Sequence, residues 1–258
     1  MKNLLLIASL ILLGSCSSDD SDSESQNNAP SGTLIKIEFY YPQTDILSSN
    51  TYFFNKEGKV VSTRGNSVTS TEYAEYTTTF SYNSNGQIWK SSTTYEGSID
   101  YTEFTFNNGL IIESLRHRNN GDVLRTLYNY NDDNQLINKQ HFNANNEETA
   151  TTNITFNSNG NIENTHYERT FGTEIRDYTY EYDTYNNPQK KLFENQELNS
   201  VVGNSFNNIT SAILLSNSGS GNTEIIIEYT YNESGYPLTS NEYVDGDLET
   251  QVTYTYME

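Results

Sequence analysis

The three histidines of this chain are the residues best suited to hold a metal ion, because imidazole nitrogens are common zinc ligands. His117, His141 and His166 are 24 and 25 residues apart, which matches the period of a repeat described below. Each lies at a different distance from the aliphatic residue that precedes it in the repeat. A shift of one residue along a strand turns a side chain to the other face of the sheet, so the three imidazoles converge only if the strands are irregular. The spacing therefore predicts isolated histidines on strands and no metal site.

Sequence motifs for covalent catalysis are absent from the chain. It has no Gly-x-Ser-x-Gly turn, no pair of cysteines and no glycine-rich phosphate-binding loop. Asn-Gly segments such as residues 83–86 are too short and carry too little charge for calcium loops, and they are typical of hairpin turns. Scattered carboxylates leave a glycosidase open, since its paired acids need not be close in sequence. These observations predict that the protein is not an enzyme and has no cofactor.

Aromatic side chains outside the core are the remaining candidates for a site, and Trp89 and Tyr95 are the strongest. They lie one and seven residues beyond Ile88, so a regular strand would place both on the face opposite Ile88. Flat aromatic rings suit the apolar faces of sugars, and neighbouring Thr and Asn side chains can hydrogen-bond to hydroxyl groups. This favours a non-catalytic binding module for a glycan or a protein. The alternatives are a Trp89 packed beneath a loop, and a structural or spacer protein without a small ligand.

The net charge narrows the range of partners. The chain has 34 acidic and 14 basic residues and a formal net charge of −20. Proteins that bind nucleic acids are basic where they bind, and a strongly negative field repels phosphates. The same field disfavours adsorption to anionic lipid headgroups. We therefore predict no nucleic-acid partner.

A repeated phrase defines the elements that position these residues. Two aromatic residues, separated by one residue, are followed by Asn or Asp, two further residues, Gly and an aliphatic residue, as in residues 80–88. The anchoring Asn or Asp falls at positions 55, 83, 107, 131, 157, 183 and 232, mostly 24–28 residues apart. A second Gly or Asn lies 14 or 15 residues after most anchors. Because Gly and Asn tolerate the positive φ that tight turns need, one period is predicted to be strand, turn, strand, turn.

The strands between these turns alternate in character. Tyr178, Tyr180 and Tyr182 are expected on one face and Thr179 and Glu181 on the other, as in a sheet with one buried and one wet face. We count roughly 14–17 strands, more than an open twisted sheet usually carries. The predicted fold class is therefore all-β: an antiparallel meander of repeated hairpins, curled into a spiral, partial barrel or two-layer wrap.

One stretch of the chain departs from this pattern, and one alternative fold shares it. The stretch 186–206 departs from the repeat, and there we expect a short helix or a packed excursion. A barrel that spans a membrane is an alternative, since the strands are numerous and alternate. Its outer face would need an aliphatic band about 25 Å tall, whereas Tyr and Asn dominate these strands.

The N-terminus has the features of an export signal. Lys2 precedes an apolar run, residues 4–13, that is too short for a membrane-spanning helix of roughly 20 residues. Residues 13–16, Leu-Gly-Ser-Cys, resemble the lipobox of bacterial lipoproteins, where signal peptidase cuts before a cysteine that carries lipid. The resemblance implies a signal peptide over residues 1–15 and lipidation of Cys16, the only cysteine. More than one acyl chain on this cysteine would anchor the protein stably in a membrane.

Residues 16–32 are expected to form a lipidated cysteine and a disordered acidic tether. The segment has no aromatic residue and no apolar periodicity, so it cannot bury enough surface to order itself. As a random coil, the stretch 17–32 reaches about 20–24 Å. The acidic cluster with Asp19 and Asp20 resembles the surface-export signal of Bacteroidota-type lipoproteins, which implies an outer-membrane lipoprotein at the cell surface. The alternative is a plain solubilising linker and a domain on the periplasmic face.

The repeated phrase itself resembles the Tyr-Asp, or RHS-type, repeats of secreted bacterial proteins, and Tyr182-Asp183 preserves the dipeptide. The likeness covers residues 33–258, which we predict to be one β-hairpin repeat domain. Most copies have Asn where Asp is typical. Together the resemblances describe a Bacteroidota-type surface lipoprotein with RHS-like repeats. They imply an all-β shell, a membrane partner through the lipid, and no catalytic residues.

We expect Cys16→Ala to abolish fatty-acid labelling and to leave uncleaved precursor, because processing at a lipobox requires the lipidated cysteine. Metabolic labelling with a palmitate analogue and the mass of the protein measure both effects. Ser18→Ala is the control, since Ser18 lies outside the motif. Normal cleavage of the Cys16→Ala chain would contradict the lipoprotein assignment.

Overall fold

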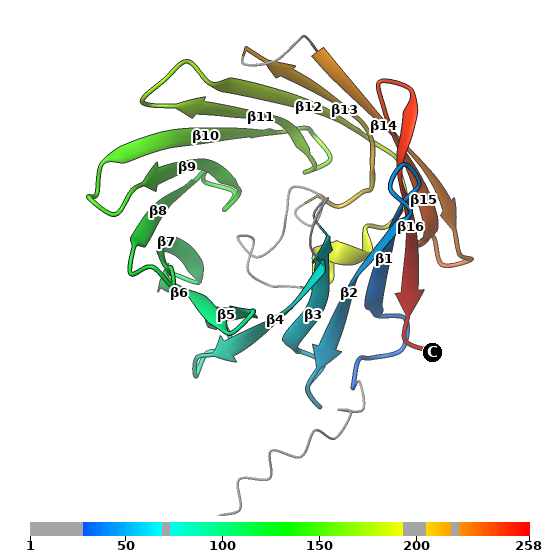
Figure 1. Cartoon of the computed structure of the whole chain (residues 1–258), viewed down its shortest axis with the longest axis horizontal. Coiled ribbons are helices and arrows are strands. Elements are labelled where there is room, and N and C mark those ends of the chain that lie inside the picture. Colours follow the sequence, from blue (N-terminus) through cyan, green and yellow to red (C-terminus); the bar gives the residue numbers. More distant parts are fainter. Residues whose placement is uncertain (1–27, 69–72, 193–204, 218–221) are drawn as a thin grey trace, which may run out of the picture.

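The computed structural model is a ring of antiparallel strands (Figure 1). It describes residues 28–68, 73–192, 205–217 and 222–258. These residues form sixteen strands and a 3-10 helix, η1, at Pro188–Lys191, so the strand number lies within the expected range. The strands are β1 Leu34–Tyr41, β2 Ile46–Phe54, β3 Val60–Val68, β4 Tyr73–Tyr82, β5 Ile88–Tyr95, β6 Ser98–Asn107, β7 Leu110–His117, β8 Val123–Tyr130, β9 Leu136–Phe142, β10 Glu148–Phe156, β11 Ile162–Arg169, β12 Ile175–Tyr182, β13 Ile209–Ser216, β14 Asn222–Tyr231, β15 Pro237–Val244 and β16 Asp247–Tyr256.

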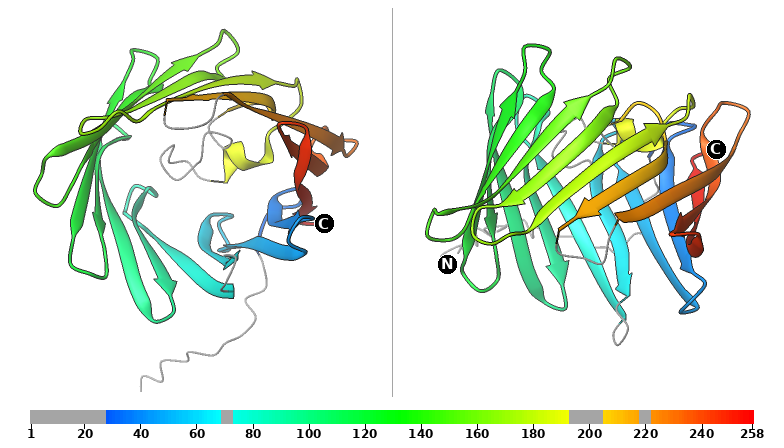
Figure 2. Two further views of the ribbon diagram at one scale, coloured as in Figure 1. Left: turned by 45° about the horizontal axis from the view of Figure 1, so that its top comes forward. Right: turned by 90° about the horizontal axis from the view of Figure 1, so that it is seen from above.

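The sheet closes on itself to form a barrel (Figure 2). Every strand pairs with its neighbours in the chain, which confirms the expected antiparallel meander, and β1 also pairs with β16. That last ladder runs from Leu34 opposite Tyr256 to Tyr40 opposite Gln251. The sequence left a spiral, a partial barrel or a two-layer wrap open. The structure is compatible with a curled sheet of this kind and carries the curling further, to a closed ring in which every strand of the described residues is paired on both sides.

The two ends of the barrel differ, and we name them by their turns. At the base, each even-numbered strand leads into the next odd-numbered strand; the mouth is the opposite end. A typical base turn is held by Asn83, whose amide donates to the carbonyl of Gln87. The Asn83 Oδ1 accepts the amides of Asn85 and Gln87 at 2.9 and 3.0 Å. The same bonds recur at the other base anchors, which explains why the repeat needs this residue: Asn55, Asn131, Asn157 and Asn232.

An extra residue follows each base turn of this kind. In the β4–β5 ladder, Tyr82 lies opposite Ile88 but Ser81 lies opposite Lys90, so Trp89 forms a β-bulge. Equivalent shifts interrupt the ladders that lead into β3, β7, β9, β11, β13 and β15. Because of this extra residue, positions that a regular strand would place on the outer face point into the barrel along the rest of each odd-numbered strand, and the reverse.

A tyrosine near the base end of an even-numbered strand closes the bulge of the preceding hairpin. Val60, the first residue of β3, offers its carbonyl to the hydroxyl of Tyr82 at 2.7 Å. Tyr182, Tyr229 and Tyr256 make the same bond to the first residues of β11, β13 and β15. A buried carbonyl without such a donor would cost roughly 1–3 kcal/mol, so the aromatic ring fills the core while its hydroxyl satisfies the backbone.

Apolar side chains gather inside the barrel near the base. On β12, Tyr180 packs into the core, whereas Thr179 and Glu181 are exposed on the outer face, as the alternation predicted. Each odd-numbered strand has a buried residue at its base end, which is the first residue of the strand except in β7, where it is the second: Leu34, Val60, Ile88, Ile111, Leu136, Ile162, Ile209 and Pro237. Toward the mouth, the inward positions are polar, as at Thr78 and Thr93, which are hydrogen-bonded to each other.

One base turn, between β12 and β13, is replaced by a longer connection. Asp183 takes the anchor position, and its Oδ1 accepts the amides of Tyr185 and Asn208. Its Oδ2 accepts the Asn208 amide group and the hydroxyl of Tyr231. Helix η1 lies inside the ring (Figure 1), and Leu192 is buried in the core cluster. The connection therefore fills part of the base, which confirms the packed excursion for its described residues.

The chain enters the barrel at the base. The side-chain amide of Asn28 donates to the carbonyl of Phe54 at 3.4 Å, and the Gly32 amide donates to the Met257 carbonyl at 2.8 Å. Both ends of the described chain thus meet beside the β2–β3 turn.

The predicted signal peptide, Cys16, Asp19 and Asp20 lie outside the described residues. The lipid anchor and the export signal therefore stay predictions. Among the residues that the structure describes, no helix is long and apolar enough to cross a membrane.

We expect Gly86→Val to lower the free energy of unfolding by about 1–3 kcal/mol, because the φ of Gly86 is 76°, a left-handed conformation. Urea denaturation measures the loss. Gly86→Asn is the matched control and should cost less, since Asn134 and Asn146 hold the equivalent turn position with φ of 60°. A new Cβ meets the Lys59 ammonium at 2.5 Å in either variant. Equal losses from Val and Asn would show that backbone strain is not the cause.

Candidate functional site

A polar cavity opens at the mouth of the barrel. It has a volume of about 950 Å³ and is lined by residues of β5–β10 and of the mouth turns between them. We call it the mouth pocket. Hydroxyl groups dominate its wall, and they come from Ser91, Thr93, Ser98, Thr102, Ser114, Thr126 and Thr149.

The structure places Trp89 and Tyr95 on opposite faces of the sheet, so the expectation that they share a face is wrong. Trp89 is the bulge residue of β5 and lies on the outer face, 39% exposed. Because it adds one residue, the positions beyond it reverse parity, and Tyr95 pairs with Tyr76 and lines the mouth pocket beside Ser91 and Thr93. Tyr95 is 36% exposed, so its ring is accessible from the pocket.

Asp100 organises the charged part of the mouth pocket. Its Oδ2 accepts a hydrogen bond from Arg116 Nη2 at 2.9 Å, and its Oδ1 accepts the backbone amide of Asn119 at 3.0 Å. The Asn119 amide, and then Arg116, hold the pKa of Asp100 below its ordinary value. One carboxylate thus ties β6 to β7 and to the turn that carries Arg118.

His141 is the histidine that faces the interior. Its two ring nitrogens lie 3.3 Å from the hydroxyls of Thr126 and Thr152, on the strands at either side. His117 and His166 lie on the outer face, so the three do not converge. Within the described residues, no three His, Cys, Asp or Glu side chains form a group able to hold a metal ion.

The histidines of the outer face have their own partners. His117 stacks on Tyr101 with ring centroids 4.3 Å apart. His166 Nδ1 lies 2.5 Å from Asp177 Oδ1, and this hydrogen bond raises the pKa of His166 above its ordinary value. These contacts join neighbouring strands, as cross-strand pairs do.

Trp89 lies beside a charged aromatic cluster on the outer face. The Lys90 ammonium is 5.9 Å from the centre of the Trp89 ring and 3.8 Å from that of Tyr101. Glu103 lies 3.7 Å from Lys90 and 3.6 Å from His117. This surface is convex and its charges are paired, so it offers less enclosure to a ligand than the mouth pocket.

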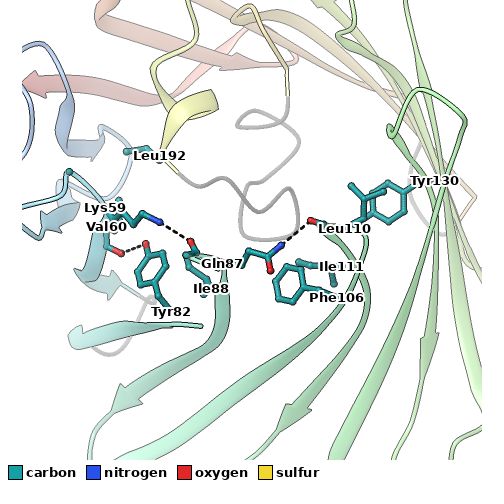
Figure 3. A pocket seen from close by; sticks show the side chains of 13 residues that line it. Lys59, Val60, Tyr82, Gln87, Ile88, Phe106, Leu110, Ile111, Tyr130 and Leu192 are labelled. Atoms are coloured by element: carbon teal, nitrogen blue, oxygen red, sulfur yellow. Dashed lines mark hydrogen bonds between the residues drawn. The ribbon is translucent and has the colours of Figure 1, made fainter. Parts of the chain in front are cut away.

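A second, smaller cavity of about 180 Å³ lies at the base (Figure 3). Apolar core residues such as Ile88, Phe106 and Ile111 line it. Its polar groups are hydrogen-bonded across adjacent turns: Lys59 donates to the carbonyl of Gly86, and Gln87 to that of Gly109. We assign it to the packing between hairpins, because it presents few free polar groups to a ligand.

Four residues of the mouth pocket were not candidates in the sequence analysis: Asp100, Arg116, Arg118 and Asn119. A signal for the arginines exists in the sequence, since residues 116–125 contain three of the 14 basic residues of a strongly acidic chain. The inward direction of Arg116 depends on the bulge at Ile112, between the paired residues Ile111 and Glu113, which the alternation alone does not reveal.

The fold and pocket define a closed sixteen-stranded antiparallel barrel with a packed base and a polar mouth. No protein-family model matches the chain, and no curated protein matches it in sequence. Among solved structures, a porin-like protein from Bacteroides uniformis is 17% identical, with a TM-score of 0.60 over 88% of this chain and 99% of that protein. This likeness shows the shared fold.

Two other solved structures are more distant. A porin-like protein from Bacteroides vulgatus is 9% identical, with a TM-score of 0.46 over 87% of this chain and 98% of that protein. A TcdB2–TccC3–Cdc42 structure is 12% identical, with a TM-score of 0.31 over 80% of this chain and 12% of that chain.

We expect the carboxyl group of Asp100 to stay ionised at lower pH than an ordinary aspartate, because its pKa is lowered in the folded protein. Its stabilising effect is present above the pKa of the unfolded state and is lost as the pH falls through the folded value. An NMR titration of the carboxyl carbon measures the pKa. Arg116→Gln should raise it only in part, since the Asn119 amide is the larger cause. A full return to the ordinary value would show that the turn does not fix Asp100.

Proposed function

We propose that this protein is a non-catalytic glycan-binding module whose ligand occupies the mouth pocket. The observation that carries the proposal is the pocket itself, a hydroxyl-lined cavity of about 950 Å³ with an accessible tyrosine ring in its wall. A volume of this size accommodates a short oligosaccharide, and concave sites of roughly 300–1,000 Å³ are usual for small ligands. The Tyr95 ring offers a flat surface for a sugar face, and the hydroxyls offer donors and acceptors in both directions.

A glycan fits this pocket better than a protein segment does. Interfaces for proteins are built around a desolvated core of apolar and aromatic side chains. Here Phe104 is buried, Phe142 packs under the Arg125 guanidinium at 5.4 Å, and the accessible wall is mostly polar. A polar wall of this kind binds through direct and water-mediated hydrogen bonds, which suits a polyhydroxylated ligand.

The expected lipid anchor fits this use of the barrel. The described chain starts at the base, where Gly32 bonds to Met257, and the mouth lies at the other end. A lipid on Cys16 would therefore hold the base toward an outer membrane and leave the mouth pocket facing away from it. The tether, with Asp19 and Asp20, would give the domain freedom to reach a ligand.

A membrane-spanning pore is the other function that a porin-like fold suggests. Two observations favour a barrel surrounded by water instead. The outward positions Glu75, Thr79 and Ser81 of β4 are polar, whereas a lipid-facing strand needs alternate apolar residues. The base is also packed with core side chains and with Leu192 from the long connection.

We expect Tyr95→Ala to remove glycan binding while leaving the melting temperature nearly unchanged, because the ring lines the pocket and is not part of the core. Screening of the purified protein on a glycan array, followed by calorimetry with the best ligand, measures binding. Trp89→Ala is the matched control and should bind normally, since it removes a similarly exposed aromatic from the outer face.

The reverse result, binding lost with Trp89→Ala and kept with Tyr95→Ala, would move the site to the outer face. No binding by the parent protein to any glycan would favour the alternative of a structural surface protein without a small ligand.

A further inference from the structure

The mouth pocket concentrates positive charge in an acidic protein. Arg116 and Arg118 line it together with a single carboxylate, Asp100, so these charges sum to +1 with His141 neutral. Arg125 borders the pocket as well, but its charge is paired with Glu113 on the outer face. The whole chain has a formal net charge of −20. The contrast matters because a charge cluster inside a concave, low-dielectric wall focuses the field on a ligand more strongly than charges spread over the surface.

The three arginines differ in what already holds them. Arg125 bonds to Glu113 at 2.5 Å on the outer face and contacts Asn146. One guanidinium nitrogen of Arg116 donates a hydrogen bond to Asp100, and the Arg116 side chain is 54% exposed. Arg118 is exposed, and its guanidinium makes no hydrogen bond or ion pair with any residue that the structure describes. Two of the three therefore have donors left for a ligand.

The backbone beneath Arg118 is fixed although its side chain is not. The Arg118 amide donates to the carbonyl of Asp122 at 2.9 Å, and the next residue, Asn119, donates to Asp100 at 3.0 Å. Gly121 completes the turn with a φ of 90°. Because the turn is fixed, only the side chain of Arg118 has to be ordered when an anion binds, which lowers the entropic cost of the site.

We infer that the ligand of the mouth pocket is an acidic glycan, whose carboxylate or sulfate group binds to the guanidinium of Arg118 with support from Arg116. The inference rests on the proposed glycan-binding function and adds the chemical class of the sugar. A guanidinium presents paired N–H donors that match the two oxygens of such a group, and hydrogen bonds to an ionised acceptor are stronger than neutral ones. Asp100 orients Arg116 toward the same region, and Tyr95 packs against the ring that bears the acid.

The negative exterior adds selectivity. A polyanion with dense charge is repelled by the rest of the surface, whereas a glycan with isolated acidic groups places them only where the arginines lie. The site is therefore expected to prefer acidic oligosaccharides over nucleic acids, although both are anionic.

The test uses the full-length protein and an array that pairs each acidic glycan with its neutral counterpart: uronic acids with their methyl esters, and sulfated with unsulfated forms. We expect binding to the acidic members and a preference of about tenfold or more over the neutral partner, because one charged hydrogen bond contributes at least that much. Binding should weaken as salt rises from low to physiological concentration. The carboxylated and sulfated pairs distinguish the two sources of charge.

Arg118→Gln should remove the preference for the acidic member and most of the salt dependence while keeping the fold. Arg64→Gln is the matched control, since Arg64 loses the same charge from the exposed outer face of β3, beside Phe53. Equal binding of acidic and neutral partners, or an unchanged preference in Arg118→Gln, would overturn the inference and leave the proposed function intact. If the parent protein binds no glycan, both fail.

Discussion

The ladder between β1 and β16 is the interaction on which the rest of this structure depends. Sixteen strands make a sheet too wide to stay flat and open, and its two edges would present unpaired backbone groups to other chains. Pairing the first strand with the last removes both edges and turns the aromatic face inward. The bonds of Gly32 and Thr33 with Met257 continue the closure to the base, so the point where the chain ends meet is also where an anchor would attach.

The closed barrel has two halves that differ in composition: the base is apolar inside, and the mouth is polar inside. At the base, tyrosine hydroxyls bond to bulge carbonyls and aliphatic residues fill the interior, so this half supplies most of the stability. At the mouth, the same inward positions carry hydroxyls, arginines and His141. Polar inward residues at the mouth do not prevent folding, because the apolar side chains buried at the base already stabilise the barrel. Such a separation lets the mouth change in sequence without loss of the fold.

The strands and turns could be predicted from local patterns in the sequence, whereas the contacts between distant segments could not. Period-two alternation identified the strands and the inward Tyr180, and the need for left-handed turns identified Gly86, whose φ is 76°. Tyr95 was placed on the wrong face because one bulge residue reverses parity beyond it. The closing pair of β1 and β16 and the meeting of Asp100 with Asn119 depend on contacts between distant strands and turns, which no local pattern specifies.

Hydroxyl-radical footprinting with and without a bound glycan tests most directly whether the barrel is a cup that binds its ligand at the mouth. Two of the exposed aromatics, Tyr95 in the mouth pocket and Trp89 on the outer face, report on the two possible surfaces in a single sample. We expect oxidation of Tyr95 to fall when the glycan is present while that of Trp89 stays the same. Protection of Trp89 with Tyr95 unchanged would contradict a binding site inside the mouth.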